Sequence, residues 1–329
     1  MERNEIYQHI QKNLQDVPLM VIGTGGTIPY GIPGMNELAD YILNTLNSKY
    51  LGQEGWENFS LNLKAGKDLE SALNGINLSS DILDDIVVAT WTLINKSDLV
   101  LFERLLDNKE LLPITKLINK FYYPSPQNVN IITTNYDRVI EYACDQIGLK
   151  VNNCFSGYYR KTFDDSPLIM KNIVNLVKVH GSLDWFKDES DYVVSIPLQN
   201  KIPKNFIPEL VTPGENKYKS IMNGEYRNLV HISDDLIKKA SAFLCIGYGF
   251  NDEQIQRNII ERVRLGTPIV IVTKSFTNES RELIRKNATK YIIIQEDKND
   301  ASITEIEING DISFLEGKLW DLNEFLEIL

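Results

Sequence analysis

The chain has 329 residues, of which 43% are hydrophobic and 24% are charged, a composition typical of a globular protein with a sizeable core. Its length fits one large domain or two ordinary ones. The formal net charge of −11 at pH 7 argues against a broad nucleic-acid or anionic-membrane surface, because both require clustered lysine and arginine.

The N-terminal segment and the cysteines indicate the compartment. Residues 1–16 carry charges throughout and lack the apolar stretch of a secretory signal, and no apolar run in the chain reaches the length of a membrane span. The cysteines are scattered, at Cys144, Cys154 and Cys245, and form no C-x-x-C pair. We therefore expect a cytoplasmic protein with reduced thiols and with no structural zinc or other metal site.

A glycine-rich loop follows the first predicted strand. Residues 2–15 have the spacing of an amphipathic helix, the apolar run 19–22 predicts a strand, and residues 35–46 predict a second helix. The loop between strand and helix contains Gly23, Gly25, Gly26, Gly31 and Gly34. This arrangement brings backbone N–H groups and a helix N-terminus against a phosphate, and glycine permits a close approach that a Cβ would block. We therefore predict a nucleotide site here.

The loop matches neither of the common phosphate-binding motifs. A G-x-G-x-x-G fingerprint starting at Gly23 would need glycine at position 28, where the chain has Ile28. A Walker A loop is also absent, because Leu61 stands where the first glycine should precede Gly66 and Lys67. A glycine-rich connection without chemical function is therefore an alternative.

A helical module is predicted next, over residues 47–123. Apolar residues recur there at helical spacing, with few β-branched runs. We interpret the segment as an insertion between the first and second strands of a sheet. Trp56 and Trp91 are expected in its core or at an interface, and no catalytic pattern stands out in it.

The second predicted strand ends in polar residues. The apolar run 129–133 is followed by Asn135 and Asp137 and then by a predicted helix over 138–147. In open α/β sheets, ligands bind beyond the C-terminal ends of the strands, so Asn135 and Asp137 are candidate site residues. The alternative is that they only cap the following helix, a common position for both residue types.

The third predicted strand, 175–179, ends in a predicted loop that begins with His180. His180 is the only histidine at a strand end, and the alternative is a hydrogen-bonded structural histidine. His9, beside the stripe of the first helix, and His231, at the start of a predicted helix over 232–240, are interpreted as surface or structural residues. Residues 191–226 contain several prolines and are predicted to form a loop-rich flap over one edge of the sheet.

The last third of the chain alternates strands and helices. A fourth strand, 243–246, ends in the glycine-containing loop 247–252. Further elements are predicted as helices over 253–265, 278–287 and 315–328 and as strands over 268–273, 291–294 and 305–308. This alternation is typical of a parallel sheet with helical crossovers. The predicted fold is α/β: a Rossmann-like parallel sheet flanked by helices, in a single domain over 1–329 with the helical insertion 47–123.

Four strand-end motifs, in this order, resemble those of the sirtuin family of NAD+-binding proteins. Residues 23–33, GTGGTIPYGIP, are similar to the sirtuin loop G-A-G-x-S-x-x-x-G-I-P. Residues 134–137, TNYD, resemble Q-N-I-D, and residues 180–182 resemble H-G-S. Residues 247–249, GYG, resemble by position the G-T-S loop that sirtuins place against the phosphates.

The departures from that pattern concern the protein substrate. Sirtuin deacylases follow G-I-P with D-F-R, where this chain has Gly34-Met35-Asn36, and the four zinc cysteines are missing. Thr134 replaces the glutamine before the asparagine. The acyl-lysine channel is therefore in doubt, while the NAD+ pocket is kept. This combination resembles the bacterial sirtuin-like NAD+ hydrolases of antiphage defence, which empty the NAD+ pool of the infected cell.

The resemblance implies a role for each motif in cleaving NAD+ to nicotinamide and ADP-ribose. Asn135 would position the nicotinamide ribose and the attacking water, with Asp137 near the carboxamide and His180 as the base. Backbone N–H groups of the glycine loops would hold the pyrophosphate. The residues expected to bind the dinucleotide are Gly23, Thr24, Gly25, Thr27, Pro33, Asp137, Gly247, Tyr248 and Gly249.

The resemblance also implies partners. NAD+ would be a substrate used without metal, and activity would depend on a homo-oligomer, or on a partner defence protein such as an ATPase or a sensor. No nucleic acid or membrane is expected to bind directly. The alternatives are a zinc-free NAD+-dependent deacylase or ADP-ribosyltransferase, and a module that senses NAD+ or ADP-ribose without turnover. The trigger, the partner and the cleavage of NADP+ are left open.

Overall fold

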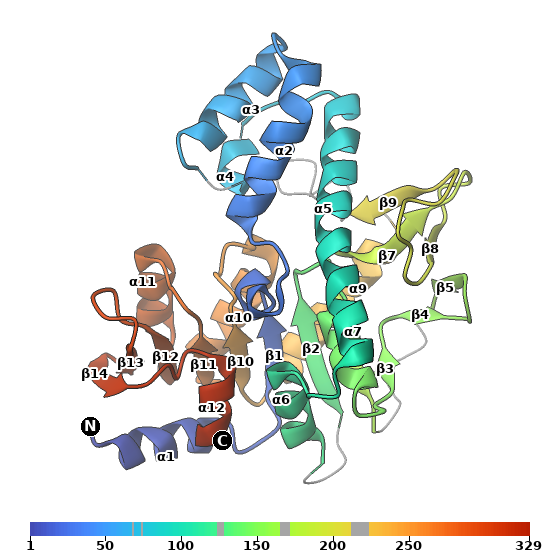
Figure 1. Ribbon diagram of the computed structural model, residues 1–329. Helices are drawn as coiled ribbons and strands as arrows, with labels where there is room; N and C mark the ends of the chain where they lie inside the picture. The colour runs from blue at the N-terminus through green and yellow to red at the C-terminus, as the bar shows by residue number, and fades with distance from the viewer. Residues whose placement is uncertain (68, 74, 124–127, 165–171, 212–223) are drawn as a thin grey trace.

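The computed structural model describes residues 1–67, 69–73, 75–123, 128–164, 172–211 and 224–329 (Figure 1). The strands of the main sheet are β1 (Leu19–Ile22), β2 (Val129–Thr133), β3 (Val151–Asn152), β6 (Val174–Lys178), β10 (Phe243–Ile246), β11 (Ile269–Val272), β12 (Tyr291–Glu296), β13 (Ile303–Ile308) and β14 (Asp311–Glu316). Their order is β14-β13-β12-β11-β10-β1-β2-β6-β3. The predicted α/β fold class is confirmed.

Strand β1 lies at the point where the strand order reverses. It pairs in parallel with β2 on one side and with β10 on the other, so that Met20 is adjacent to both Ile131 and Leu244. All four residues of β1 are buried, which fits its uninterrupted apolar sequence. Open α/β sheets bind ligands at such a switch point, beyond the C-terminal ends of the strands.

Helices cover both faces of the sheet. The helices α1 (Arg3–Asn13), α6 (Pro113–Tyr122), α7 (Val139–Asp145) and α12 (Leu322–Ile328) contribute to the core that contains Met20 and Ile22. The helices α9 (Gly224–Lys239), α10 (Glu253–Arg264) and α11 (Asn278–Asn287) contribute to the core that contains Leu19 and Val21. Alternate residues of one strand thus enter two different cores, as the pleat requires.

The segment between β1 and β2 carries the helices α2 (Met35–Tyr50), α3 (Glu54–Lys64), α4 (Leu69–Leu73), α5 (Ser80–Asp107) and α6. Figure 1 shows α2, α3 and α4 standing away from the main sheet, while α5 runs from this module down to the sheet. Trp56 and Trp91 are both buried. Helix α5 packs along α2, and its C-terminal half reaches the loops at the strand ends, as described below.

The C-terminal end differs in detail from the predicted edge strand over 305–308 and closing helix over 315–328. Strands β13 and β14 are antiparallel and make the sheet mixed, and α12 begins only at Leu322. The turn between the two strands is Asn309-Gly310, in which both residues have positive φ (50° and 101°). Asn-Gly is the preferred pair for such a hairpin turn, and it ends one strand and starts the next.

A second, antiparallel sheet replaces much of the predicted loop region. It consists of β4 (Phe155–Ser156), β5 (Lys161–Phe163), β8 (Val193–Ser195), β7 (Gly181–Lys187) and β9 (Ile207–Leu210), in this order. The residues after His180 are therefore a strand and not a loop. Residues 212–223 of the predicted flap lie outside the described residues. His231 lies within α9, which begins earlier than predicted.

Within the part of the chain that the structure describes, no helix combines the length and the apolar character needed to cross a membrane.

Candidate functional site

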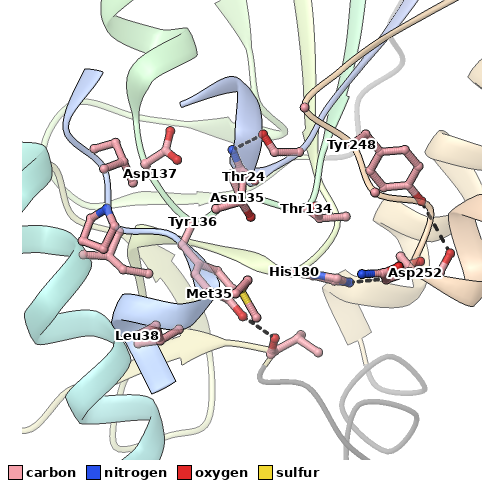
Figure 2. Close-up of a pocket in the computed structure, with 18 residues that line it drawn as sticks. Thr24, Met35, Leu38, Thr134, Asn135, Tyr136, Asp137, His180, Tyr248 and Asp252 are labelled. Carbon is pink, nitrogen blue, oxygen red and sulfur yellow. Dashed lines mark hydrogen bonds and ion pairs between the residues drawn. The ribbon is translucent and has the colours of Figure 1, made fainter. Parts of the chain in front are cut away.

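A pocket of about 240 Å³ lies beyond the C-terminal ends of β1, β2 and β10 (Figure 2). Four chain segments that were predicted as strand-end loops meet there, as the shared edge of a parallel sheet requires. The predicted site residues that line the pocket are Gly23, Thr24, Pro33, Asn135, Asp137, His180, Gly247, Tyr248 and Gly249. Gly25 and Thr27 do not line it, although both contact residues that do.

The two glycine loops pack main chain against main chain. Gly25 N–H donates to the Gly247 carbonyl at 3.1 Å, Gly23 N–H to Ile246 at 3.0 Å, and Gly247 N–H to Val272 at 2.8 Å. A Cβ at Gly247 would lie 2.0 Å from the nitrogen of Gly26, where no atom fits. These glycines are therefore required by the contact between the loops. The N–H groups of Gly23, Gly25 and Gly247 bond to protein carbonyls, which differs from the expected pyrophosphate contact.

Asn135 is held by its amide nitrogen. Nδ2 donates to the Gly23 carbonyl and to Thr27 Oγ1, both at 3.1 Å, and the side chain is buried. The Gly23 carbonyl can only accept, so the amide cannot be reversed. Oδ1 of Asn135 is buried and has no hydrogen-bond partner among the described residues. Asn135 therefore presents a fixed, unused acceptor at the pocket wall.

Asp137 bridges the loop after β2 to the glycine loop and to α7. Its Oδ2 accepts from Thr27 Oγ1 at 3.0 Å, and its Oδ1 accepts from the Val139 N–H at 3.2 Å. Asp137 therefore accepts from the first N–H of α7, whose N-cap is Arg138. Burial, the largest cause, raises the pKa of Asp137 to about 6, although nearby Lys178 acts to lower it.

Lys178, at the end of β6, holds the loop that follows β2. Its side chain is 1% exposed, and Nζ donates to the carbonyls of Tyr136 and Asp137 and to Glu141 Oε1. A buried ammonium with three acceptors is satisfied, so it fixes the backbone on which Asn135 and Asp137 sit.

His180 contacts a carboxylate at the edge of the pocket. Its Nε2 lies 2.8 Å from Oδ2 of Asp252, and its side chain is 13% exposed (Figure 2). Its backbone carbonyl accepts from the Val211 N–H at 2.9 Å. His9 and His231 are exposed and do not line the pocket. Of the three histidines, His180 alone is placed to act on a ligand there.

The rest of the pocket was not predicted. Its apolar side comes from Ile32, from Met35 and Leu38 of α2, and from Ile94 of α5. Sequence reasoning missed Ile94 because nothing in the helical module 47–123 indicated that it reaches the strand ends. It missed Ile32, Met35 and Leu38, which lie in or just after the glycine-rich loop, because only backbone donors were considered there. Asp252 was also missed: its position before a helix indicates a cap, but its contact with His180 is not local.

Helix α5 contacts three chain segments that follow strands of the main sheet. Its Asp98 pairs with Arg138 at 2.7 Å and accepts from the Arg138 N–H. Trp91 Nε1 donates to the Leu183 carbonyl at 2.8 Å, and Arg104 donates to the Tyr30 carbonyl at 3.2 Å. The helix therefore holds the chain after β1, after β2 and after β6 at once.

The family profile of the SIR2-like domain matches residues 129–304. Solved structures of sirtuins are similar to the chain at low identity. One, on sirtuin substrate affinity, is 13% identical, covering 88% of this chain and 93% of that chain with a TM-score of 0.45. A second, on Sir2 mechanism and regulation, is 15% identical, covering 85% and 90% with a TM-score of 0.47. No curated protein sequence matches the chain.

The pocket combines a fixed acceptor with an imidazole that has a carboxylate partner. Such a pair suits the orientation of a hydroxyl or a water and the removal of its proton. Among the residues described, no three histidine, cysteine, aspartate or glutamate side chains are grouped to hold a metal ion.

Proposed function

The chain belongs to the SIR2-like domain family, a sirtuin-like NAD+-binding domain, and from this premise we propose that its pocket hydrolyses NAD+. Water would replace nicotinamide on the ribose carbon, so that NAD+ and water give nicotinamide, ADP-ribose and a proton. The observation that carries the proposal is the buried Oδ1 of Asn135, which has no partner among the described residues and lies in a pocket shared with His180.

The chemistry of this bond fits those two side chains. Breaking it leaves oxocarbenium character on the ribose and releases neutral nicotinamide, so little acid catalysis is needed. What the reaction needs is an acceptor that orients water or a ribose hydroxyl and a base that takes the proton. We assign the first role to Asn135 and the second to His180, and no step in this proposal passes through a metal.

The dinucleotide is proposed to lie across the two glycine loops. Gly23, Thr24, Gly247, Tyr248 and Gly249 line that side of the pocket. Asp137, on the adjacent wall, would receive the carboxamide, because each of its carboxylate oxygens keeps a lone pair beyond its one bond within the protein. Pro33 would border the nicotinamide, while Thr27 and Gly25 would act indirectly, through Asn135 and through the contact between the loops.

We further propose that the protein is an effector of antiphage defence whose activity is gated by self-association or by a partner such as an ATPase or a sensor. The support is the resemblance described above together with the reaction itself, because an ungated NAD+ hydrolase would poison its own cell. Full activity in a dilute sample that is demonstrably monomeric and free of partner would contradict the gating.

The test is incubation of purified protein with NAD+ over a range of protein concentrations, with nicotinamide and ADP-ribose followed by chromatography. We expect both products in equal amounts, formed about 10²–10⁴-fold more slowly by Asn135→Ala protein. Products that form only when an acetyl-lysine peptide is added would favour the deacylase alternative. Calorimetric binding of NAD+ without products at any concentration would favour a sensing module.

A further inference from the structure

The carboxylate of Asp252 makes two contacts that have different purposes. Its Oδ1 accepts from the Ile255 N–H at 2.9 Å and caps α10, and its Oδ2 lies 2.8 Å from Nε2 of His180. Both side chains are largely buried, at 6% and 13% exposed. The helix cap therefore fixes the position of the carboxylate that faces the imidazole.

An ionised carboxylate only accepts hydrogen bonds, and a neutral imidazole has one N–H and one lone pair. The nitrogen that faces Asp252 must then carry the proton, which leaves the lone pair on Nδ1. A carboxylate in this position also stabilises the imidazolium that forms when the other nitrogen takes a proton.

We propose that Asp252 is a positioning residue that holds His180 in its Nε2–H form, so that Nδ1 is the nitrogen that accepts the proton. The role of Nδ1 as the base rests on the proposed hydrolysis. The pairing of Asp252 with His180 does not depend on that proposal. The loop 247–252 then has two roles. Its Gly247 packs against the glycine-rich loop after β1, and its last residue, Asp252, orients His180.

The decisive variant is Asp252→Asn. Asparagine is as good a helix cap as aspartate, so its Oδ1 keeps the bond to Ile255 N–H and its NH2 group faces His180. The amide NH2 donates, so Nε2 of His180 must then accept and the proton must move to Nδ1. The matched control is Asp321→Asn, in which the same substitution affects an N-cap that accepts from Asn323 N–H at 2.8 Å and lies outside the pocket.

The first measurement needs no activity. The protein has three histidines, so a long-range proton–nitrogen spectrum of 15N-histidine-labelled protein resolves His180 once His180→Ala identifies its signals. The spectrum is recorded at a pH high enough that a further increase does not change the imidazole signals, so that the neutral form is observed. We expect Nε2–H in the wild type and in Asp321→Asn, and Nδ1–H in Asp252→Asn. A proton on Nδ1 of His180 in the wild type would overturn the inference. A proton that stays on Nε2 in Asp252→Asn would overturn it as well.

The second measurement is turnover. Asp252→Asn should lower kcat roughly 10²-fold with KM for NAD+ nearly unchanged, and it should cause no further loss in a His180→Ala background. An equal loss in that background, or a faster Asp252→Asn enzyme, would overturn the positioning role. A wild type that does not hydrolyse NAD+ would remove the proposed function, and the spectrum would still decide the pairing.

Discussion

The two walls of the pocket are built from different parts of the chain. One wall is main chain, where the loops of Gly23 and Gly247 touch each other, and the other is a set of side chains that includes Asn135 and His180. On the main-chain wall, a substitution that adds a Cβ to a glycine would disrupt the packing. On the side-chain wall, a substitution that removes a polar group would reduce activity. The first wall therefore depends on the fold, whereas the second can be altered in a folded protein, and experiments can separate the two.

The largest effect is expected on the main-chain wall. Gly247→Ala would place a Cβ 2.0 Å from the nitrogen of Gly26, at a φ of +55° that alanine rarely adopts. We expect a loss of at least about 3 kcal/mol in the free energy of unfolding, measured by denaturant titration. Gly249→Ala is the matched control, because its Cβ would meet no atom closer than 3.5 Å. Equal losses for the two variants would contradict the role given to the loop contact.

The side-chain wall should lose activity and keep its fold. Asn135→Ala and His180→Ala should each lower kcat about 10²–10⁴-fold, which is typical for losing one group in acid–base catalysis. Thermal unfolding of each variant shows whether the fold persists. His9→Ala and His231→Ala, both at exposed positions, are the controls and should be near wild type. Folded His180→Ala protein that turns over NAD+ at the wild-type rate would end this mechanism.

A smaller effect on stability is expected at Asp137, whose side chain bonds to Thr27 in the glycine-rich loop. Its pKa is raised to about 6 in the folded protein, so the native state binds this proton more tightly than the unfolded chain does. Its contribution to stability is therefore fully present at low pH and is lost as the pH rises from about 4 to about 6.

Asp137→Asn removes this titration. Relative to the wild type, the variant should gain on the order of 2 kcal/mol of stability between about pH 4 and pH 7, measured by denaturant titration at each pH. Parallel pH profiles for the two proteins would show that the buried carboxylate does not titrate in this range.

The smallest effect is expected from removing metal ions, because we expect neither wall of the pocket to contain a bound metal. The three buried cysteines lie in different parts of the fold: Cys144 lies in α7, Cys154 between β3 and β4, and Cys245 in β10, so we expect no zinc cluster. Washing with a strong chelator should leave the melting temperature unchanged within error. A clear decrease, restored by adding zinc and not by magnesium, would contradict this expectation.

The sequence predicts which strand-end segments meet at the pocket. Strands 129–133 and 243–246 were placed without error, because runs of apolar residues buried on both faces leave a continuous signal. Asn135 and His180 follow from the rule that strand ends carry function. The hairpin at Asn309-Gly310 had a local signal that the prediction did not use.

The antiparallel sheet had no comparable signal. Strand β7 starts with a glycine and contains Ser182 and Asp184, which read as a loop. In the folded protein, Asp184 accepts from Ser182 and from Ser195 on the neighbouring strand, so these polar groups are paired in the interior. Pairs between distant segments, like that between His180 and Asp252, are not encoded in any local pattern.

Helix α5 limits how the length of this chain can vary. It has 28 residues, about 42 Å, and its contacts to the segments after β1, β2 and β6 come from Trp91, Asp98 and Arg104. Inserting one residue between Trp91 and Arg104 would turn the later contact residues by about 100° about the helix axis and move them away from their partners. Loops tolerate such changes at little cost. Relatives that keep this pocket should therefore gain or lose residues before Trp91, in the part of the module remote from the sheet, and seldom between these three contacts.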